Sequence, residues 1–490
     1  AYVAPDGKPR GYHADNVPFR PQHWLTVSQK GVHRGDLVLI LGYPGSTERY
    51  LTAAAVADRQ GIYYPMRHEL LTGVIERIEK ACGGDAAMQL RYSATIKSLA
   101  NVQKNALGMV KGLARNATVQ LKSEQEEQFL RWVEADPQRK EKYGAVLQEL
   151  RELDATAATT TLRDLLFVNL MSSRVLPWLS TSVQLLAAIH GQREGQPVQI
   201  SRGLARAVQS KTTDRDLSEV QAPVLFYLLA EARRLPESQR LRGVEAFDAK
   251  DLAGLRKLLA ASPLASPEGR KALLKGGMQG LTDHTDPTVA LARALAGELA
   301  DYRRRHTEDE GRRMVVGPRW ISAQQQWRGK SFYPDANSTL RVAIATVKGY
   351  QPRDGVWYPP HTTVSGILEK DTGKDPFAVP AALRKAARNR DRSAYFDQAI
   401  GDVPVCFLAD GDTTGGNSGS PLINGKGELV GLNFDRAFES VSGDYGWNEQ
   451  RSRNISVDIR YVLWFLEQVV PAKHLLQEMS AGASRAGSRR

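Results

Sequence analysis

The alternation of hydrophobic and polar positions divides the chain into stretches of two kinds. Residues 1 to about 56 and about 331 to 475 carry short hydrophobic runs between Gly-, Pro- and Asp-rich turns, which is typical of β-strands. From about 57 to 330, hydrophobic residues such as Leu70 and Val74 recur every three or four positions, with charged residues between them. That period predicts amphipathic helices. The pattern therefore predicts an α+β protein in which a helical block is inserted between two β-rich segments.

Six hydrophobic runs are candidate strands, and a short helix closes the second β-rich segment. The first run, 36–41, ends in the turn sequence Gly42-Tyr43-Pro44-Gly45. The chain opens with Tyr2 and Val3 ahead of a Pro-Asp-Gly turn, as at the end of a strand, so we expect that the natural chain begins further upstream. The Ser-, Gly- and Arg-rich end, 476–490, is predicted to be disordered. The other candidate strands are 340–347, 403–408, 422–423, 429–434 and 455–457, and the closing helix is 462–469.

Length and charge narrow the classes of protein. A chain of 490 residues exceeds one ordinary core, so two or three domains are expected. No hydrophobic run reaches the length of a membrane-spanning helix, which argues against a membrane span. The net charge of +12 raises nucleic-acid binding as an alternative function. Because the basic residues are scattered and not interleaved with aromatic residues, a solvated basic surface is the preferred interpretation and no nucleic-acid partner is predicted.

The two cysteines, Cys82 and Cys406, lie far apart in the sequence and in different predicted domains. Neither has the spacing of a metal ligand, so no metal and no cofactor are predicted. A disulfide between them stays open as an alternative, although two buried free thiols are favoured.

A glycine-rich loop between two candidate strands carries the clearest chemical signal. From Asp412 to Pro421 its sequence is Asp-Thr-Thr-Gly-Gly-Asn-Ser-Gly-Ser-Pro. A nucleophilic serine needs an exposed hydroxyl on a tight turn, with backbone N–H groups directed at the developing oxyanion. We therefore predict Ser418 as a nucleophile, the N–H groups of Gly416 and Ser418 as its oxyanion hole, and Asn417 as the residue that holds the loop. The alternative is an ordinary Gly- and Ser-rich surface turn.

Together with several shorter matches, this loop resembles the bacterial serine dipeptidyl-peptidases of the dipeptidyl-peptidase 7 and 11 type, a branch of the chymotrypsin clan. The resemblance covers nearly the whole chain and implies a chymotrypsin-like β-barrel peptidase domain with a large inserted all-α domain. It implies that residues 1–56 are the remnant of a mostly missing first barrel, 57–330 the inserted domain, and 331–475 the second barrel. The shorter matches are 15–18, 42–47, 333–337, 366–373 and 455–460.

The resembled enzymes release dipeptides from a free peptide N-terminus, so the resemblance implies residues that hold the substrate's ammonium group. Asp435, directly after the candidate strand 429–434, matches the family's amine-binding carboxylate, which forms a charge-assisted hydrogen bond. Asn101 resembles an asparagine of the helical domain that also touches the substrate N-terminus, and Asn105 lies nearby. The alternatives are a surface Asp at a strand end and a plain exposed helical Asn.

Arg436 distinguishes two branches of the resembled family. The branch that prefers hydrophobic residues before the cleaved bond has glycine at this position, and the branch that prefers Asp or Glu has arginine. A guanidinium in the specificity pocket can pair bidentately with a substrate carboxylate. The resemblance therefore implies cleavage after Asp or Glu, with a preference for hydrophobic residues as the alternative. For the residue itself, the alternative is a solvated Arg436 that points away from the cleft.

None of the nine histidines stands in the sequence context in which this family keeps its general base. In the resembled enzymes the orienting Asp also falls upstream of the position of Ala1. We therefore expect a chain that lacks the catalytic His and Asp and is nearly inactive alone. A non-catalytic peptide-binding relative is the alternative. The histidines are His13, His23, His33, His68, His190, His284, His306, His361 and His474, of which His13 and His23 lie in turn-like β segments and stay open as unusual bases.

The resemblance has implications for location and partners as well. Members of the family are exported to the periplasm or the cell surface, and they are often homodimers. They act on peptides with a free N-terminus and need no cofactor, since nucleophilic serine chemistry requires none. The expected partners are therefore peptide substrates and, in the family's manner, a second copy of the chain.

Overall fold

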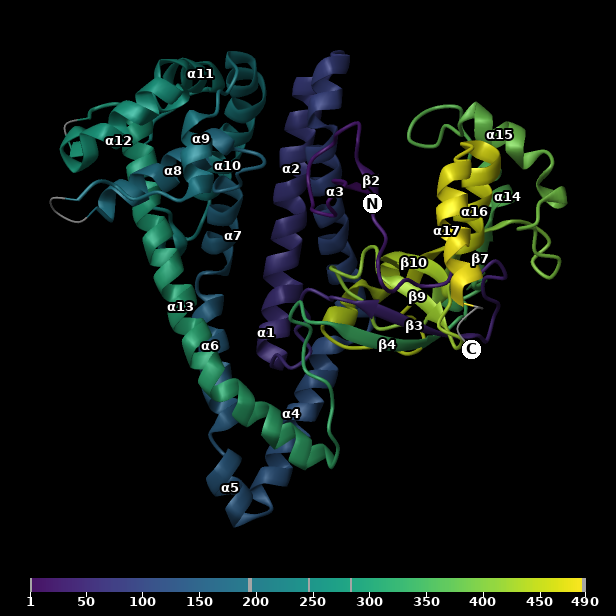
Figure 1. Ribbon diagram of the computed structural model, residues 1–490. Helices are drawn as coiled ribbons and strands as arrows, with labels where there is room; N and C mark the ends of the chain where they lie inside the picture. Colours follow the sequence, from purple (N-terminus) through teal and green to yellow (C-terminus); the bar gives the residue numbers. More distant parts are fainter. Residues whose placement is uncertain (1, 193–195, 246, 283, 487–490) are drawn as a thin grey trace. The chain divides into compact units, whose positions relative to one another are not determined.

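The computed structural model describes residues 2–192, 196–245, 247–282 and 284–486, and these form two compact units (Figure 1). Unit 1 comprises Ala1–Arg49 and Pro334–Arg490, and unit 2 comprises Tyr50–Tyr333. Unit 1 contains the β-sheets together with short helices, whereas the described part of unit 2 contains only helices and their connections. The predicted combination of helix and sheet is thus confirmed.

The hydrophobic period of the sequence produces the helices of unit 2. Helix α2, for example, buries Leu70, Val74 and Ile78, which are spaced four residues apart on one side of the helix. None of the described helices combines the length and the apolar character that a bilayer crossing requires. The helices are α1 (Ala53–Asp58), α2 (Tyr64–Cys82), α3 (Ala86–Arg115), α4 (Thr118–Glu134), α5 (Pro137–Tyr143), α6 (Val146–Ala158), α7 (Thr161–Leu170), α8 (Pro177–His190), α9 (Arg202–Gln209), α10 (Ala222–Arg233), α11 (Leu252–Ala261), α12 (Pro267–Thr282) and α13 (Pro287–Arg328).

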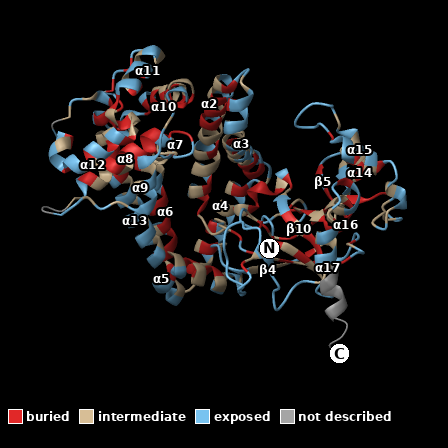
Figure 2. Cartoon of the chain, turned by 45° about the horizontal axis from the view of Figure 1, so that its top comes forward, coloured by how far each residue is buried: buried red, intermediate tan, exposed pale blue. Residues whose placement is uncertain are grey.

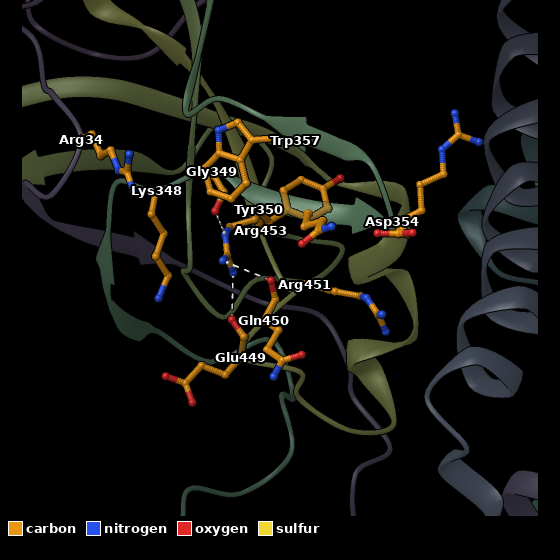
Figure 3. A pocket seen from close by; sticks show the side chains of 12 residues that line it. Arg34, Lys348, Gly349, Tyr350, Asp354, Trp357, Glu449, Gln450, Arg451 and Arg453 are labelled. Carbon is orange, nitrogen blue, oxygen red and sulfur yellow. Dashed lines mark hydrogen bonds between the residues drawn. The ribbon is translucent and has the colours of Figure 1, made fainter.

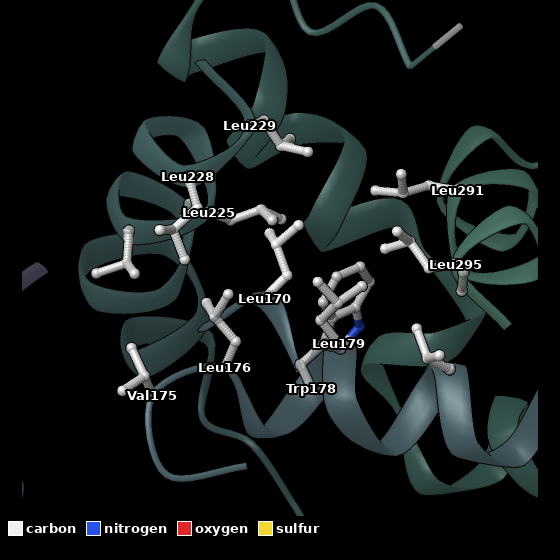
Figure 4. Close-up of a cluster of buried hydrophobic side chains, with 14 of the residues drawn as sticks. Leu170, Val175, Leu176, Trp178, Leu179, Leu225, Leu228, Leu229, Leu291 and Leu295 are labelled. Atoms are coloured by element: carbon white, nitrogen blue, oxygen red, sulfur yellow. The ribbon is translucent and has the colours of Figure 1, made fainter. Parts of the chain in front are cut away.

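The core of unit 2 is built where leucine-rich faces of several helices meet. Leu170 of α7, Trp178 of α8, Leu225 of α10 and Leu295 of α13 belong to one buried cluster (Figure 4). Figure 2 shows the buried residues gathered along α8 and α10. Because burial of such side chains stabilises each by roughly 1.5–3 kcal/mol, this core holds the helices together without a disulfide.

Unit 1 is organised by a seven-stranded antiparallel sheet. Strands β3 and β4 pair along their whole length, from Leu37 opposite Thr346 to Gly42 opposite Arg341. Beyond β4, Val347 pairs with Ala409 at the end of β8. This bridge joins two strands that are not neighbours in the sheet order, so that six of the seven strands close on themselves. The sheet order is β4 (Arg341–Thr346), β3 (Leu37–Gly42), β9 (Pro421–Asn424), β10 (Leu429–Arg436), β11 (Asn454–Asp458), β8 (Pro404–Ala409) and β7 (His361–Thr363).

The expected boundaries assign residues 1–56 to the remnant of a mostly missing first barrel, and this assignment stays a prediction. Within these residues, strand β3 lies between β4 and β9, in the sheet that carries the Ser418 loop. Its alternate residues Val38 and Ile40 are buried in one cluster with Leu422 of β9. Unit 2 is therefore inserted between two adjacent strands of one sheet. The hydrophobic run predicts a strand, but its pairing partner lies some three hundred residues further along the chain.

The predicted strands are all present, with ends displaced by one or two residues. Between β4 and β8, however, the structure has elements that the sequence analysis did not assign, because their hydrophobic runs are short. Strand β5 (Tyr350–Arg353) pairs only with β6 (Val356–Tyr358), and β7 is followed by helix α14 (Val364–Glu369). The remaining elements of unit 1 are β1 (Tyr2–Val3) paired with β2 (Val17–Pro18), α15 (Ala381–Ala387), α16 (Ile459–Trp464), the π-helical turn η7 (Phe465–Val469) and α17 (Lys473–Ala486).

Helix α17 corrects the prediction of a disordered tail over 476–490. The described part of that segment is helical as far as Ala486, and residues 487–490 lie outside the described residues. Leu475, Leu476 and Met479 are partly buried at helical spacing. These apolar positions give the helix a face that can pack, which the Ser, Gly and Arg content of the tail concealed.

Both cysteines are free thiols, Cys82 in α2 and Cys406 in β8. Burial raises the pKa of Cys406 to about 11. Because the thiolate is the reactive form, the raised pKa keeps this thiol unreactive near neutral pH.

The sequence Asp458-Ile459-Arg460, one of the stretches that resembles the family, forms a buried ionic anchor. Arg460 is only 3% exposed and donates to the carboxylates of Asp458 at 2.7 Å and Asp397 at 2.5 Å. The Nε2 atom of His33 lies 2.7 Å from the same Asp397 carboxylate. The anchor joins the segment before β3, the segment before β8 and the start of α16. Loss of one partner would leave a buried charge uncompensated, which is strongly destabilising.

Asp397 makes the stability of unit 1 depend on pH. Burial by itself raises the pKa of this carboxyl, but hydrogen bonds from the Ile400 N–H and His33, with the charge of Arg460, hold its pKa below 3.8. A carboxyl whose pKa is lower in the folded than in the unfolded protein stabilises the fold. This stabilisation is fully present above the pKa of the unfolded state and is lost as the pH falls through the pKa of the folded state. As the pH is lowered from about 5 to about 3, we expect the urea concentration at the midpoint of unfolding to decrease. The decrease should be smaller for Asp397→Asn, which lacks the titrating carboxyl. Equal pH dependence of the two proteins would contradict this assignment.

Candidate active site around Ser418

The loop between β8 and β9 presents Ser418 to solvent from a rigid support. Its Oγ lies 3.5 Å from the carbonyl oxygen of Phe434 on β10. On one side Asn417 is buried, and on the other the N–H of Gly419 donates to the Asn433 carbonyl at 2.7 Å. The serine hydroxyl is therefore exposed while the backbone around it is fixed to the neighbouring strand, as a nucleophile requires.

The backbone N–H groups of Gly416 and Ser418 are among those in this loop that have no acceptor among the described residues. By contrast, the Asn417 N–H donates to the Thr414 carbonyl at 3.1 Å. Gly416 has φ +107°, and a Cβ there would meet the carbonyl oxygen of Tyr43. Only glycine satisfies both conditions. The two free N–H groups are the donors that the sequence analysis proposed for an oxyanion.

Three buried asparagines support the loop from behind. The side-chain amide of Asn433 donates to the Asn417 carbonyl at 3.2 Å, and that of Asn454 donates to Asn433 Oδ1 at 3.1 Å. Asn454 Oδ1 in turn accepts the N–H of Gly411 at 3.2 Å, where the loop begins. The sequence indicated a structural role only for Asn417. The available signal was an asparagine within the run Gly-Leu-Asn-Phe and another at the start of the run Asn-Ile-Ser-Val.

Replacement of Asn454 with alanine should loosen this support. It leaves the Gly411 N–H and the side-chain Oδ1 of Asn433 buried without these partners, so we expect a loss of about 2–4 kcal/mol in the free energy of unfolding. Urea denaturation of Asn454→Ala measures the loss, and Asn389→Ala, at an exposed asparagine of unit 1, is the control. A loss no larger than that of the control would show that the three asparagines do not support the loop.

The Gly-Tyr-Pro-Gly turn after β3 packs against the same loop. The N–H of Gly45 donates to the Gly415 carbonyl at 2.6 Å. Gly42 lies so close to the side chains of Asn417 and Ser420 that a Cβ would collide with both. Two stretches that resemble the family thus meet at one place although they are far apart in the sequence.

Asp435 lies on β10 at a β-bulge beside the serine. Asn433 pairs with Ser456 and Asp435 with Ile455, so Phe434 is the extra residue of the bulge. A bulge re-aims the side chains next to it. The Asp435 carboxylate is exposed, accepts only the N–H of the next residue at 2.8 Å, and has no cationic partner among the described residues. It is therefore free for a cation that approaches Ser418.

Arg436 is held inside a small pocket and does not point into solvent. Its side chain is 12% exposed, and it donates through both Nη atoms to Asp444 at 2.6 and 2.8 Å. Gly411, Thr413 and Trp447 also line this pocket. The side chain is therefore not solvated, and its partner Asp444 is a residue that no local pattern indicated. The Nε–H of Arg436 makes no hydrogen bond to a described residue.

The structure describes the other candidate residues in other elements. Asn101 is exposed on α3 and belongs to unit 2, whereas Ser418 belongs to unit 1. Among the described residues no histidine forms a hydrogen bond to Ser418. His13 is next to Asp15, and His361 lies 3.0 Å from the Val32 carbonyl, where burial lowers its pKa.

Comparison with known proteins identifies the family. The family model described as Peptidase S46 matches residues 1–481. Two relatives named Asp/Glu-specific dipeptidyl-peptidase, from Capnocytophaga gingivalis and Shewanella putrefaciens, are 32% and 30% identical over 98% of this chain and 68% and 69% of their own lengths. The crystal structure of Porphyromonas endodontalis DPP11 in complex with dipeptide Arg-Glu superposes with a TM-score of 0.81 at 25% identity, covering 98% of this chain and 69% of that one. The chain belongs to the Peptidase S46 family, whose relatives here are dipeptidyl-peptidases.

Proposed function

We propose that this chain carries the nucleophile of a serine-type exopeptidase that releases dipeptides ending in Asp or Glu from the free N-terminus of peptides. One observation carries the proposal: the exposed Ser418 hydroxyl stands beside two backbone N–H groups that have no acceptor among the described residues. The names of the Asp/Glu-specific relatives support the reaction and the specificity.

We infer that the closed sheet of unit 1 is a chymotrypsin-like barrel. Six antiparallel strands that close through Val347 and Ala409, with Ser418 on the loop that enters β9, support this interpretation. In such a barrel we expect the second strand of the hairpin that follows the nucleophile to form a wall of the substrate cleft. Here that strand is β10, which carries Asp435 and Arg436.

In the proposed reaction Ser418 Oγ gives its proton to the general base and attacks the carbonyl carbon of the second residue of the substrate. The N–H groups of Gly416 and Ser418 stabilise the oxyanion, for which they need no reorganisation. The C–N bond then breaks, the rest of the peptide leaves as an amine that takes up the proton, and water hydrolyses the dipeptidyl ester and frees the serine. Asp435 pairs with the ammonium group, which fixes the cleaved bond two residues from the N-terminus and makes the enzyme an exopeptidase. Asn101 is proposed as a second contact to that N-terminus.

Arg436 is proposed to recognise the acidic side chain before the cleaved bond. Asp444 holds its guanidinium in place through two hydrogen bonds, which leaves the Nε–H for a substrate carboxylate. A side chain held in position loses less entropy when it binds than a mobile one.

We further propose that the general base is not among the histidines of these 490 residues. The absence of a histidine hydrogen bond to Ser418 within the described residues supports this. The purified 490-residue chain should then release dipeptides at no more than the residual rate that oxyanion stabilisation provides. Activity of the chain that is abolished by His13→Ala or His23→Ala would overturn this part of the proposal.

Export to the periplasm or the cell surface, and assembly as a homodimer, complete the proposal and rest on the family resemblance. Cell fractionation and the mass in solution, measured by light scattering, test these two points.

The experiment that tests the function uses the protein as its gene encodes it. Peptides with Asp, Glu, Leu or Phe as second residue are offered with a free or an acetylated N-terminus. We expect dipeptides only from free N-termini, and fastest from the Asp and Glu peptides. Equal cleavage of acetylated peptides would overturn the exopeptidase assignment, and faster cleavage after Leu or Phe would favour the hydrophobic branch. No cleavage, with peptide binding retained, would favour a non-catalytic peptide-binding protein.

A further inference from the structure

Unit 1 contains a second cavity, of about 810 Å³, that does not involve Ser418, Asp435 or Arg436 (Figure 3). Its walls come from Arg34 before β3, from the β5–β6 hairpin, and from the segment 449–453 ahead of β11. Arg453 also lines the small pocket of Arg436, so the two cavities share one wall.

The cavity has an excess of positive charge. Five cationic side chains line it against two carboxylates, those of Asp354 and Glu449. Two of the five cations have partners within the protein. Lys348 pairs with Asp410 at 2.6 Å. Arg453 is 4% exposed and donates to backbone carbonyl groups around it. The remaining three are Arg34, Arg353 and Arg451.

These three arginines have no hydrogen-bonded or ionic side-chain partner among the described residues. Arg34 lies over the ring of Trp357, 5.8 Å from its centroid. Scattered surface arginines need no explanation, but unpaired like charges that line one cavity repel each other until an anion enters. A guanidinium binds carboxylate or phosphate through parallel hydrogen bonds.

The hairpin that forms one wall favours a peptide over a compact anion. Strands β5 and β6 pair only with each other within the described sheets, so each has an outer edge that can pair with an extended chain. Gln351 and Arg353 of β5 are exposed two residues apart, on the same face of the strand. The cations are also spread over the cavity, which suits carboxylates on separate residues.

We propose that this cavity binds an acidic peptide segment with at least two side-chain carboxylates, at a site distinct from the Ser418 loop. Arg34, Arg353 and Arg451 pair with the carboxylates, and Trp357 covers the apolar part of the segment. The site requires neither the nucleophile nor a free peptide N-terminus, so it does not depend on the proposed peptidase activity.

The test measures binding to the Ser418→Ala chain by isothermal titration calorimetry. The probe is a short Glu-rich peptide with an acetylated N-terminus, and the same peptide with Gln in place of Glu is its neutral counterpart. We expect the Glu peptide to bind, and the double variant Arg353→Glu/Arg451→Glu to weaken it by about tenfold or more, since two charge-assisted contacts are lost. Arg353→Gln/Arg451→Gln should weaken it less, and Arg388→Glu, at an exposed arginine outside the cavity, should leave it unchanged.

Four results would overturn the proposal. Equal binding of the Gln counterpart would remove the role of the carboxylates, and unchanged binding by both double variants would remove the role of the cavity. Loss of binding in Arg436→Gly, with the double variants unaffected, would place the peptide in the small pocket instead. Complete displacement of the peptide by an equal concentration of inorganic phosphate would identify a small-anion site.

Discussion

Ser418→Ala is expected to reduce dipeptide release by the gene-encoded protein by at least about 10⁴-fold, because the attacking oxygen is lost while the binding groups remain. The substitution removes one exposed oxygen and leaves the hydrogen bonds of Asn417 and Gly419 in place. The free energy of unfolding should therefore hardly change. Initial rates with a free-N-terminal Glu peptide, compared at equal protein concentration, measure the effect.

A second serine of unit 1 provides the control for this result. Ser393, in the segment before β8, accepts a local N–H hydrogen bond from Tyr395 at 3.2 Å. Ser393→Ala should retain the wild-type rate. A serine-reactive phosphonate should label the wild-type protein once and the Ser418→Ala protein not at all. Release by Ser418→Ala at more than a few per cent of the wild-type rate would mean that another residue attacks the peptide bond.

Arg436→Gly is expected to change specificity rather than abolish activity. The substrate carboxylate loses a charged hydrogen-bond partner, and Asp444 is left as an unpaired negative charge in the pocket. Because each 1.4 kcal/mol corresponds to tenfold, we expect kcat/KM for Glu peptides to fall by about 100-fold or more while Leu peptides are cleaved as fast or faster. The ratio of the two kcat/KM values measures the change and is insensitive to the fraction of active protein.

The variant Arg436→Gly/Asp444→Asn separates the two causes. If the single variant fails mainly because Asp444 repels the substrate, the added Asn restores much of the Glu rate. If the guanidinium itself binds the carboxylate, the double variant stays slow with Glu peptides and cleaves Leu peptides well. An unchanged Glu-to-Leu ratio in both variants would show that Arg436 does not recognise the substrate side chain.

Features that depend on a few neighbouring residues follow from the sequence alone. Hydrophobic residues such as Leu70, Val74 and Ile78 recur at the helical period, and this period predicts the helix that buries them. The strand over 36–41 and the glycine-flanked turn at Ser418 were predictable for the same reason. The backbone conformation there follows from local side-chain spacing and from the φ angles that glycine permits.

Which of these elements meet depends on contacts between residues far apart in the sequence. The tertiary structure pairs β3 with β4 across the whole of unit 2, brings Asn454 under the Ser418 loop and joins Arg436 to Asp444. None of these contacts has a local signal, because many strands could bury the alternate residues Val38 and Ile40 equally well. The choice among them is made when the sheet closes and every buried polar group has to find a partner at once. The supported serine and the paired arginine are products of that closure.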